Sequence, residues 1–151
     1  MLFLIKTKQK KLCFSVQEAE NHIAFYATLT AQTTLGQKQT IEFDHIFTNI
    51  GNGYTGVSGV FTVSITGIYQ FSTTMFKVTS TQNQIHTQLM KNNNPVGQNY
   101  GNSNGASATQ TVIVSAQKGD IVYVRHHEFL ASTQQTIYGE GYSSFSGFLI
   151  S

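Results

Sequence analysis

The stretch that decides the fold reads Tyr54-Thr-Gly-Val-Ser-Gly-Val-Phe-Thr-Val-Ser-Ile-Thr-Gly-Ile-Tyr-Gln-Phe71. From Val57 to Ile65 the odd positions are apolar or glycine, and most even positions carry a hydroxyl group. This period of two indicates a β-strand with one buried face. Thr66-Gly67 interrupts the pattern, and a second alternating run begins at Tyr69. Two such runs joined by a glycine-containing break predict consecutive antiparallel strands.

The composition of the 151 residues extends this prediction to the whole chain. Charged residues make up only 11%, there is one proline, and tryptophan is absent. Helices usually carry Glu, Lys and Arg on their solvent faces, whereas Thr and Ser suit exposed strand faces, so an all-β domain is predicted. A chain of this length fits one domain with a substantial core. It contains no apolar run of roughly 18 residues, and no membrane insertion is expected.

The charges are unevenly distributed along the chain. Residues 6–11 hold four of the nine basic residues, and Glu18 and Glu20 are two of the seven acids. The part after residue 23 is left with five bases and five acids, so it is neutral. A neutral surface attracts phosphate weakly, and no nucleic-acid partner is expected. For the basic stretch itself, a solvated tail and a contact with an anionic surface remain the alternatives.

Residues 1–22 are expected to form a leader or tail, and residues 23–151 a globular domain. The apolar run Met1–Ile5 is short and precedes the lysines, which reverses the usual order of a secretory signal. The sequence by itself therefore does not decide whether the chain is exported. Cys13 is the only cysteine, which excludes an internal disulfide and a zinc-binding cysteine pattern. An inert thiol and a link between two chains both remain open.

Short alternating segments recur along the rest of the chain, with turn residues such as Lys118-Gly-Asp120 between them. In the segment 41–47, we expect Ile41, Phe43, His45 and Phe47 to share one face. Residues 92–105 form the longest irregular stretch, because Asn, Gly and Ser dominate it. About eight to ten strands at this spacing predict a β-sandwich or jelly roll. Further strands are expected at residues 25–31, 69–75, 85–89, 112–116, 121–125 and 144–150.

Several short motifs, taken in order, carry a family resemblance that covers residues 23–151. The chain resembles the globular C1q domain, within the tumour-necrosis-factor-like jelly-roll superfamily. The resemblance implies a ten-stranded jelly roll that assembles as a compact homotrimer. The matching pieces are Ala24-Phe25, Ile41-Glu-Phe-Asp44, Thr48-Asn-Ile-Gly51, Tyr54, Gly59-Val-Phe-Thr62, Gly67-Ile-Tyr-Gln-Phe71, Lys91-Asn92, Lys118-Gly-Asp120 and Phe145-Ser-Gly-Phe-Leu149.

The strand patterns agree with a trimer in one respect, because some strands are apolar on both faces. Phe76 follows Met75, and Phe148 precedes Leu149. A monomer needs one apolar face per sheet, so the surplus apolar surface indicates a subunit interface. Ordinary scatter of apolar residues over the surface is the alternative.

The chain also departs from the family pattern. Many relatives have Cys-Pro where this chain has Val63-Ser64, and no Gly-X-Y collagen repeat precedes the domain. We therefore expect a globular head that acts without a collagen stalk. Some relatives hold calcium with acidic residues in the loop before the strand at Val112, so the resemblance makes calcium possible, but residues 92–106 contain no carboxylate. Because calcium prefers charged oxygen ligands, no cofactor is expected.

Catalytic and metal-binding patterns are weak, and no enzyme is predicted. The acids do not pair in a pattern typical of a glycosidase, and no serine lies in a nucleophile elbow. Asp44-His45 would face opposite sides of a strand. His126 and Glu128 share a strand face, yet two ligands alone do not make a metal site.

What remains is ligand binding, for which the uncharged Asn- and Tyr-rich loops are suited. Amide groups donate to and accept from sugar hydroxyls, and tyrosine rings stack on sugar C–H surfaces. The jelly-roll order predicts that the loops 92–106 and 131–141 lie at the same end. Arg125, the only arginine, would pair with the carboxylate of an acidic sugar; an intersubunit ion pair or an exposed charge are the alternatives. The predicted ligand-binding residues are Tyr100, Asn102, Asn104, Arg125, His127, Tyr138 and Tyr142.

The resemblance implies a function as well as a fold. Stalkless members of this family include lectin-like defence proteins, so we expect a secreted, extracellular recognition protein of innate immunity. It would bind glycans on cell or microbial surfaces as a homotrimer, with sialic acid among the expected ligands. The main alternative is a stalkless signalling or adhesion ligand that binds a protein receptor. A purely structural trimer is a third reading.

Overall fold

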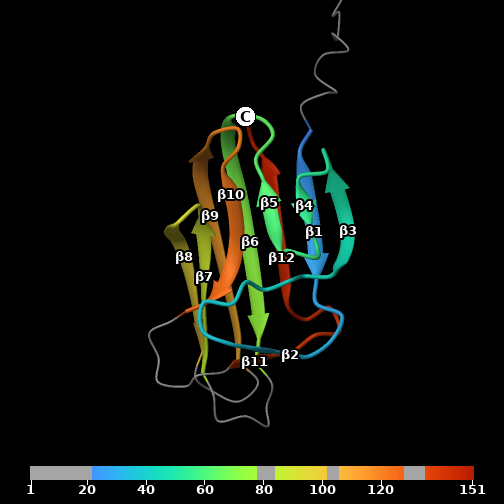
Figure 1. Ribbon diagram of the computed structural model, residues 1–151, viewed down its shortest axis with the longest axis vertical. Helices are drawn as coiled ribbons and strands as arrows, with labels where there is room; N and C mark the ends of the chain where they lie inside the picture. The colour runs from blue at the N-terminus through green and yellow to red at the C-terminus, as the bar shows by residue number, and fades with distance from the viewer. Residues whose placement is uncertain (1–21, 78–83, 102–105, 128–134) are drawn as a thin grey trace, which may run out of the picture.

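The chain forms a β-sandwich in a computed structural model that describes residues 22–77, 84–101, 106–127 and 135–151. Two five-stranded sheets face each other, and a two-stranded ribbon lies at one end (Figure 1). The all-β jelly-roll prediction is confirmed. The strands are β1 (Ala24–Thr28), β2 (Thr33–Leu35), β3 (His45–Ile50), β4 (Tyr54–Thr55), β5 (Val60–Thr62), β6 (Gly67–Phe76), β7 (Ile85–Lys91), β8 (Asn94–Gly101), β9 (Ser107–Ala116), β10 (Ile121–His126), β11 (Gln135–Ile137) and β12 (Ser144–Leu149).

The two sheets are named here after their long strands. The β6 sheet has the order β3-β1-β12-β6-β9, and the β7 sheet has the order β4-β5-β10-β7-β8. All pairings in both sheets are antiparallel. The opening stretch of the sequence contributes to both sheets, because β5 lies in the β7 sheet and β6 lies in the β6 sheet. The break at Thr66-Gly67 is thus a crossing from one layer to the other.

An aromatic cluster fills the space between the sheets. The ring of Phe25 stacks on Tyr54 and on Phe61 with centroids 4.8 Å apart in each case. Phe145 meets the same ring edge-on, also at 4.8 Å. Gly147, two residues after Phe145 on β12, leaves room for the rings of Phe25 and Phe71. Alternation in the strands therefore builds a closely packed core at the centre of the sandwich.

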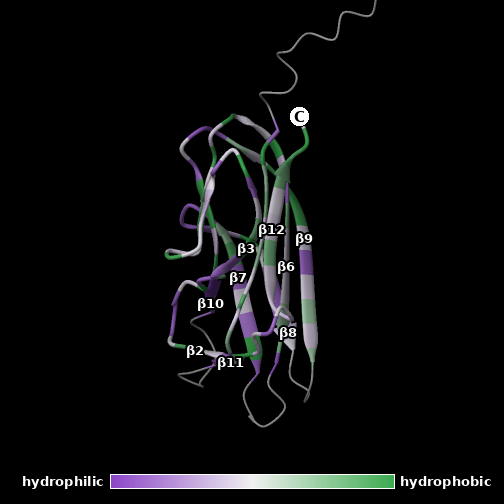
Figure 2. Cartoon of the chain, turned by 90° about the vertical axis from the view of Figure 1, so that its right-hand side faces the viewer, coloured by the Kyte–Doolittle hydropathy of each residue, from purple (hydrophilic) through white to green (hydrophobic). Residues whose placement is uncertain are grey.

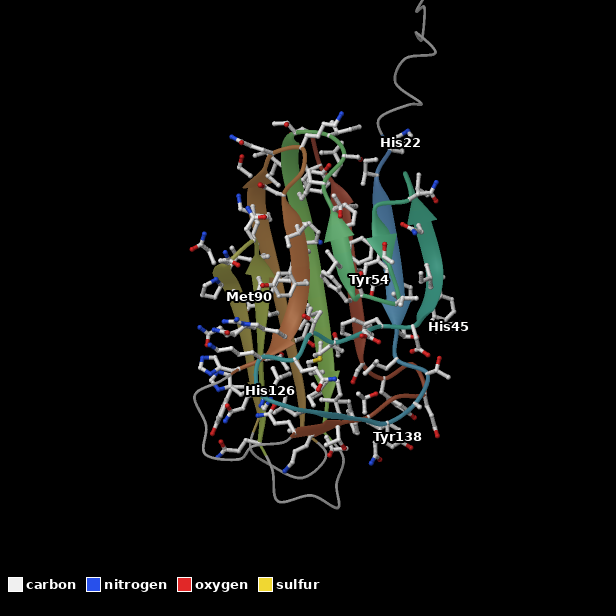
Figure 3. All side chains as sticks on the ribbon, viewed as in Figure 1. His22, His45, Tyr54, Met90, His126 and Tyr138 are labelled. Atoms are coloured by element: carbon white, nitrogen blue, oxygen red, sulfur yellow. The ribbon has the colours of Figure 1, made fainter. Side chains whose placement is uncertain are left out.

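The interior becomes polar toward the end where β7 begins and β10 ends. Asn99 and Thr73 are buried and join the two sheets through a 2.7 Å hydrogen bond from Nδ2 to Oγ1. His126 is also buried, and its Nδ1 donates to the carbonyl of Gly36 at 2.7 Å. Figure 3 shows Tyr54 in the middle of the sandwich and His126 nearer this polar end.

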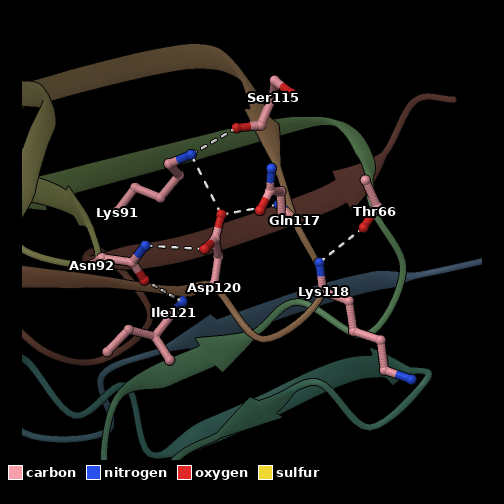
Figure 4. Close-up of polar contacts among 8 residues, drawn as sticks. All are labelled: Thr66, Lys91, Asn92, Ser115, Gln117, Lys118, Asp120 and Ile121. Atoms are coloured by element: carbon pink, nitrogen blue, oxygen red, sulfur yellow. Dashed lines mark hydrogen bonds and ion pairs between the residues drawn. The ribbon is translucent and has the colours of Figure 1, made fainter.

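A polar network holds the turn between β9 and β10 (Figure 4). The carboxylate of Asp120 accepts from the side chain of Asn92 at 3.0 Å and from the amide N–H of Gln117 at 2.9 Å. It also pairs with Lys91 at 3.4 Å. Asn92 in turn accepts from the amide of Ile121 at 3.0 Å. The network ties the end of β7 to the start of β10 and fixes the predicted Lys118-Gly-Asp120 turn.

The prediction of an irregular stretch at residues 92–105 is wrong for residues 94–101, which form β8. This strand pairs with β7 from Asn94 to Gly101. Asn92 adopts a φ of 52°, so the chain reverses there and the two strands lie side by side. Pairing with β7 satisfies the backbone hydrogen bonds of a segment whose composition is typical of turns. Pro95 is accommodated near a bulge in the pairing, between Leu89 and Met90.

The expected common face of Ile41, Phe43, His45 and Phe47 is also only half right. Ile41 and Phe43 are fully buried, whereas Phe47 is 61% exposed and His45 is exposed. Strand β3 begins only at His45, and its pairing with β1 shifts register between Tyr26 and Ala27. Because Ile41 and Phe43 lie before β3, they do not share the alternation of that strand, and the second half of the segment faces outward.

Candidate functional site

The outward surface of the β7 sheet carries a group of polar side chains from three strands. The register places Gln88 of β7 between Arg125 of β10 and Gln98 of β8, and places His86 beside Tyr100. Figure 2 shows hydrophilic segments along β7 and β10. We call this surface the polar face and define it as His86, Gln88, Gln98, Tyr100, Arg125 and His127.

Arg125 is held in a fixed orientation on the polar face. Its Nε and Nη2 both donate to Oε1 of Gln88, at 3.1 and 2.9 Å. Gln88 is only 5% exposed, so it cannot swing away without losing its packing. An arginine has further N–H donors beyond these two. The guanidinium is therefore preorganised to receive an acceptor from a ligand.

Three rings cover the rest of the polar face. His86 and His127 stack in parallel, with centroids 3.9 Å apart and planes 6° apart. Tyr100 meets His86 edge-on at 5.5 Å, and Nε2 of His86 donates to Oε1 of Gln98 at 3.2 Å. Partial burial, and then the positive charges of His86, Arg125 and His126, lower the pKa of His127. The neutral form of the His127 imidazole is therefore favoured.

The structure brings together three of the predicted ligand-binding residues and separates others. Tyr100, Arg125 and His127 share the polar face. Tyr138 and Tyr142 instead pack against Phe76, with ring centroids 5.9 and 5.4 Å from it. Phe76 lies on the outward side of β6. These tyrosines therefore lie against the outward surface of the β6 sheet, whereas the polar face is on the β7 sheet. Asn102, Asn104 and Glu128 lie outside the described residues.

Sequence reasoning missed His86, Gln88 and Gln98. The first two are the even neighbours of the predicted core residues Ile85, Thr87 and Leu89, so strand parity would have placed them outward. Gln98 was hidden in the stretch that the sequence indicated as irregular. The candidate metal pair of His126 and Glu128 is also weakened, because His126 points inward and bonds the carbonyl of Gly36.

The outward surface of the β6 sheet is apolar at one end and rich in hydroxyl groups in the middle. Ile50, Phe148 and Ile113 are 51%, 42% and 65% exposed and follow one another across the sheet through Ala24 and Gln70. One row further, Ser72 and Thr111 are hydrogen-bonded at 2.9 Å. Exposed apolar side chains in one row, interrupted by Gln70 alone, on a sheet already packed on its other side indicate a partner surface.

The two-layer jelly roll, with five antiparallel strands in each sheet, defines the class of protein. The C1q domain family matches residues 24–150, and the chain belongs to that family. It is 30% identical over 140 residues to one of the chains of the human complement C1q subcomponent, covering 88% of this chain and 52% of that protein. It is also 32% identical over 134 residues to zebrafish (Danio rerio) Caprin-2, covering 85% of this chain and 14% of that protein.

Solved structures agree on the fold. The globular domain of zebrafish complement 1qA protein superposes with a TM-score of 0.70 at 21% identity, covering 85% of this chain and 98% of that one. Eiger TNF from S. frugiperda gives 0.63 at 14% identity, covering 85% and 92%. The chain spans about half the length of two curated relatives, the human complement C1q protein and mouse C1q tumor necrosis factor-related protein 3.

No three His, Cys, Asp or Glu side chains in the described ranges come together as a metal site. No helix in the same ranges is long and apolar enough to cross a membrane.

Proposed function

We propose that this C1q-domain chain is a secreted recognition protein that acts as a homotrimer and binds glycans on cell or microbial surfaces, as a lectin does. The observation that carries the proposal is the polar face. Amide groups at Gln88 and Gln98 and rings at Tyr100, His86 and His127 offer the two interactions that sugars use, hydrogen bonds to hydroxyls and stacking on C–H surfaces.

The homotrimer follows from the opposite sheet. Domains of the C1q and tumour-necrosis-factor kind typically form trimers, and the exposed Ile50, Phe148 and Ile113 on the outward surface of the β6 sheet support such an assembly. Burying Ile113 and Phe148 against neighbouring subunits would leave the β7 sheet, with its polar face, on the outside. Three weak sites on one rigid body gain avidity when a target surface presents matching spacing.

The proposal does not require calcium. Residues 92–106 contain no carboxylate, and neither do the residues of the polar face, whose imidazole and guanidinium groups are poor ligands for a hard cation. A signalling or adhesion ligand for a protein receptor is the second candidate. The presence of exposed Tyr100 and of Arg125 on the same face favours it, because Tyr and Arg are enriched in protein interface hot spots.

A glycan array probed with the purified full chain tests the proposal. We expect binding to a subset of glycans, inhibition by the corresponding free sugar, and loss of binding in Tyr100→Ala. Tyr142→Ala, which truncates an exposed tyrosine on the other sheet, is the matched control. A blank array together with tight, sugar-resistant binding to one cell-surface protein would replace the lectin proposal by the receptor-ligand alternative.

A further inference from the structure

Buried polar side chains form a row across the inward surface of the β7 sheet, directly beneath the polar face. The pairing sets His126 of β10 opposite Thr87 of β7, and Thr87 opposite Asn99 of β8. All three side chains are at most 3% exposed. Directly opposite residues on antiparallel strands have Cβ atoms about 4.5–5.5 Å apart. The three side chains therefore lie beside one another inside the sandwich.

A fourth polar side chain reaches this row from the two-stranded ribbon at the end of the sandwich. Gln135 of β11 is fully buried, and its Oε1 accepts from the amide of His86 at 2.7 Å. Because His86 is the residue next to Thr87, the carboxamide of Gln135 lies against β7 at the row. We define the internal polar row as His126, Thr87, Asn99 and Gln135.

Each residue of the internal polar row carries a buried polar atom that has no hydrogen-bond partner among the described residues. These atoms are Oγ1 of Thr87, Oδ1 of Asn99, Nε2 of His126 and Nε2 of Gln135. Buried polar groups are nearly always hydrogen-bonded, because an unpaired one loses its hydration and gains nothing in return. Four of the six such side-chain atoms in the described part of the chain are gathered in this one row. A common partner would satisfy all four.

The side chains cannot simply turn toward one another, because three of the four are held by other hydrogen bonds. Nδ2 of Asn99 donates to Oγ1 of Thr73 on the opposite sheet at 2.7 Å. Nδ1 of His126 donates to the carbonyl of Gly36, also at 2.7 Å. Oε1 of Gln135 is fixed by the backbone amide that it accepts from. Direct pairing within the row would break these bonds.

The existing bonds also determine what each remaining atom can do. A carbonyl only accepts, so Nδ1 of His126 carries the proton and Nε2 of the neutral ring is an acceptor. Oδ1 of Asn99 is an acceptor too, whereas Nε2 of Gln135 is a donor and the hydroxyl of Thr87 can act either way. The partner of the row must therefore both donate and accept. An anion cannot donate and a metal ion cannot accept, but water does both.

We infer that the internal polar row is a hydration site that binds ordered water. The water donates to Nε2 of His126 and to Oδ1 of Asn99. It accepts from Nε2 of Gln135 and from the hydroxyl of Thr87. Buried waters in globular proteins typically make about three hydrogen bonds, so four partners of matching character are ample. The water joins β7, β8, β10 and β11 from inside, and the bond from Asn99 to Thr73 extends the connection to β6.

The hydration site lies behind the candidate functional site. Residues of the row alternate along the strands with residues of the polar face, as Thr87 does with His86 and Gln88. Water that bridges the three strands therefore supports the register in which the polar face is displayed. The inference concerns the interior of the sandwich alone, so it stands or falls independently of the ligand that the polar face binds.

A crystal structure of the full chain, at a resolution that shows ordered water, tests the inference directly. We expect solvent density inside the sandwich, within about 2.7–3.2 Å of at least three of the four atoms. Three results would overturn the inference: side chains rotated so that they bond one another, a row without solvent density, or an ion in place of water.

The substitution Thr87→Val tests the site in solution, because valine has nearly the shape of threonine and lacks the hydroxyl. Removing a hydroxyl that bonds water is expected to lower the Tm by roughly 2–6 °C. Removing a hydroxyl without a partner would leave the Tm unchanged or raise it, and that result would overturn the inference. Thr62→Val, the same change at an exposed position of β5, is the matched control and should shift the Tm by less than about 2 °C.

Discussion

At the residue scale, Gly147 shows how close packing of the core limits the size of a side chain on β12. A Cβ atom at this position would lie 2.6 Å from Cε1 of Phe71 and 2.8 Å from Cε1 of Phe25. These rings are held by the aromatic cluster and cannot retreat without losing their own packing. We predict that Gly147→Ala lowers the free energy of unfolding by roughly 1–3 kcal/mol.

The measurement for Gly147→Ala is urea denaturation at fixed protein concentration. Gly36→Ala is the matched control, since its Cβ would meet only the side chain of Gln39 at an ordinary 3.5 Å. Equal midpoints for the two variants would contradict the packing described for β12.

His127 gives a second prediction at the residue scale. Its pKa is lowered in the folded chain by burial and by the charges of His86, Arg125 and His126. As the pH falls below about 6.5, the ordinary pKa of histidine, the unfolded chain takes up the proton first, so stability decreases with falling pH. We predict that His127→Gln reduces the loss of Tm between pH 7.5 and pH 5.5. His22→Gln, which changes an exposed histidine, should leave the loss unchanged; the same pH dependence in both variants would contradict the account.

At the element scale, the turn between β9 and β10 depends on Asp120. The bond from Asn92, followed by the amide of Gln117 and the charge of Lys91, lowers the pKa of its carboxyl group. The pKa of Asp120 in the folded chain thus lies below its value of about 3.9 in the unfolded chain. The carboxylate stabilises the fold above about pH 3.9, and this contribution is lost as the pH falls through the pKa of the folded chain.

We therefore predict that Asp120→Asn lowers the Tm by a few degrees at pH 7 and that its difference from the wild type shrinks as the pH approaches the folded pKa. Thermal scans between pH 7 and pH 3 measure both effects. Lys118→Gln, in the same turn, is the control. A variant that matches the wild type at pH 7 would show that the network in Figure 4 does not stabilise the turn.

The elements also show what alternation can and cannot predict. Strands β6 and β12 were predictable because Tyr69, Phe71 and Phe145 recur at period two. Strand β8 was not, because its residues favour turns and only its pairing with β7 makes it a strand. Tertiary context overrides local propensity most readily in such polar edge segments. Gln98, a residue of the polar face, lies on β8 and was therefore not predicted as a site residue.

At the scale of the whole molecule, part of the candidate site followed from the sequence. Strand parity placed Arg125 and His127 on one face, and the structure adds Tyr100 through the β7–β8 pairing. The sequence could not show which sheet Tyr138 and Tyr142 lie against. Two loops at the same end of the sandwich can each cover either sheet. The structure places them with Phe76 instead.

The proposed trimer can be tested on the outward surface of the β6 sheet. Ile113→Asp would place a charge in the proposed interface, where it is costly to desolvate. We predict a folded monomer or a sharply weakened trimer by sedimentation equilibrium. Ile121→Asp, the same change on the outward side of the β7 sheet, should remain trimeric. If both variants were monomeric, or if neither were, the result would contradict an interface on the outward surface of the β6 sheet.

The most direct test of the account is native mass spectrometry of the full chain with the strongest ligand from the glycan array. A trimer of 16.7 kDa subunits with one polar face per subunit predicts a species near 50 kDa that takes up as many as three ligands. A species at the mass of one subunit, or a trimer that takes up no ligand, would contradict it.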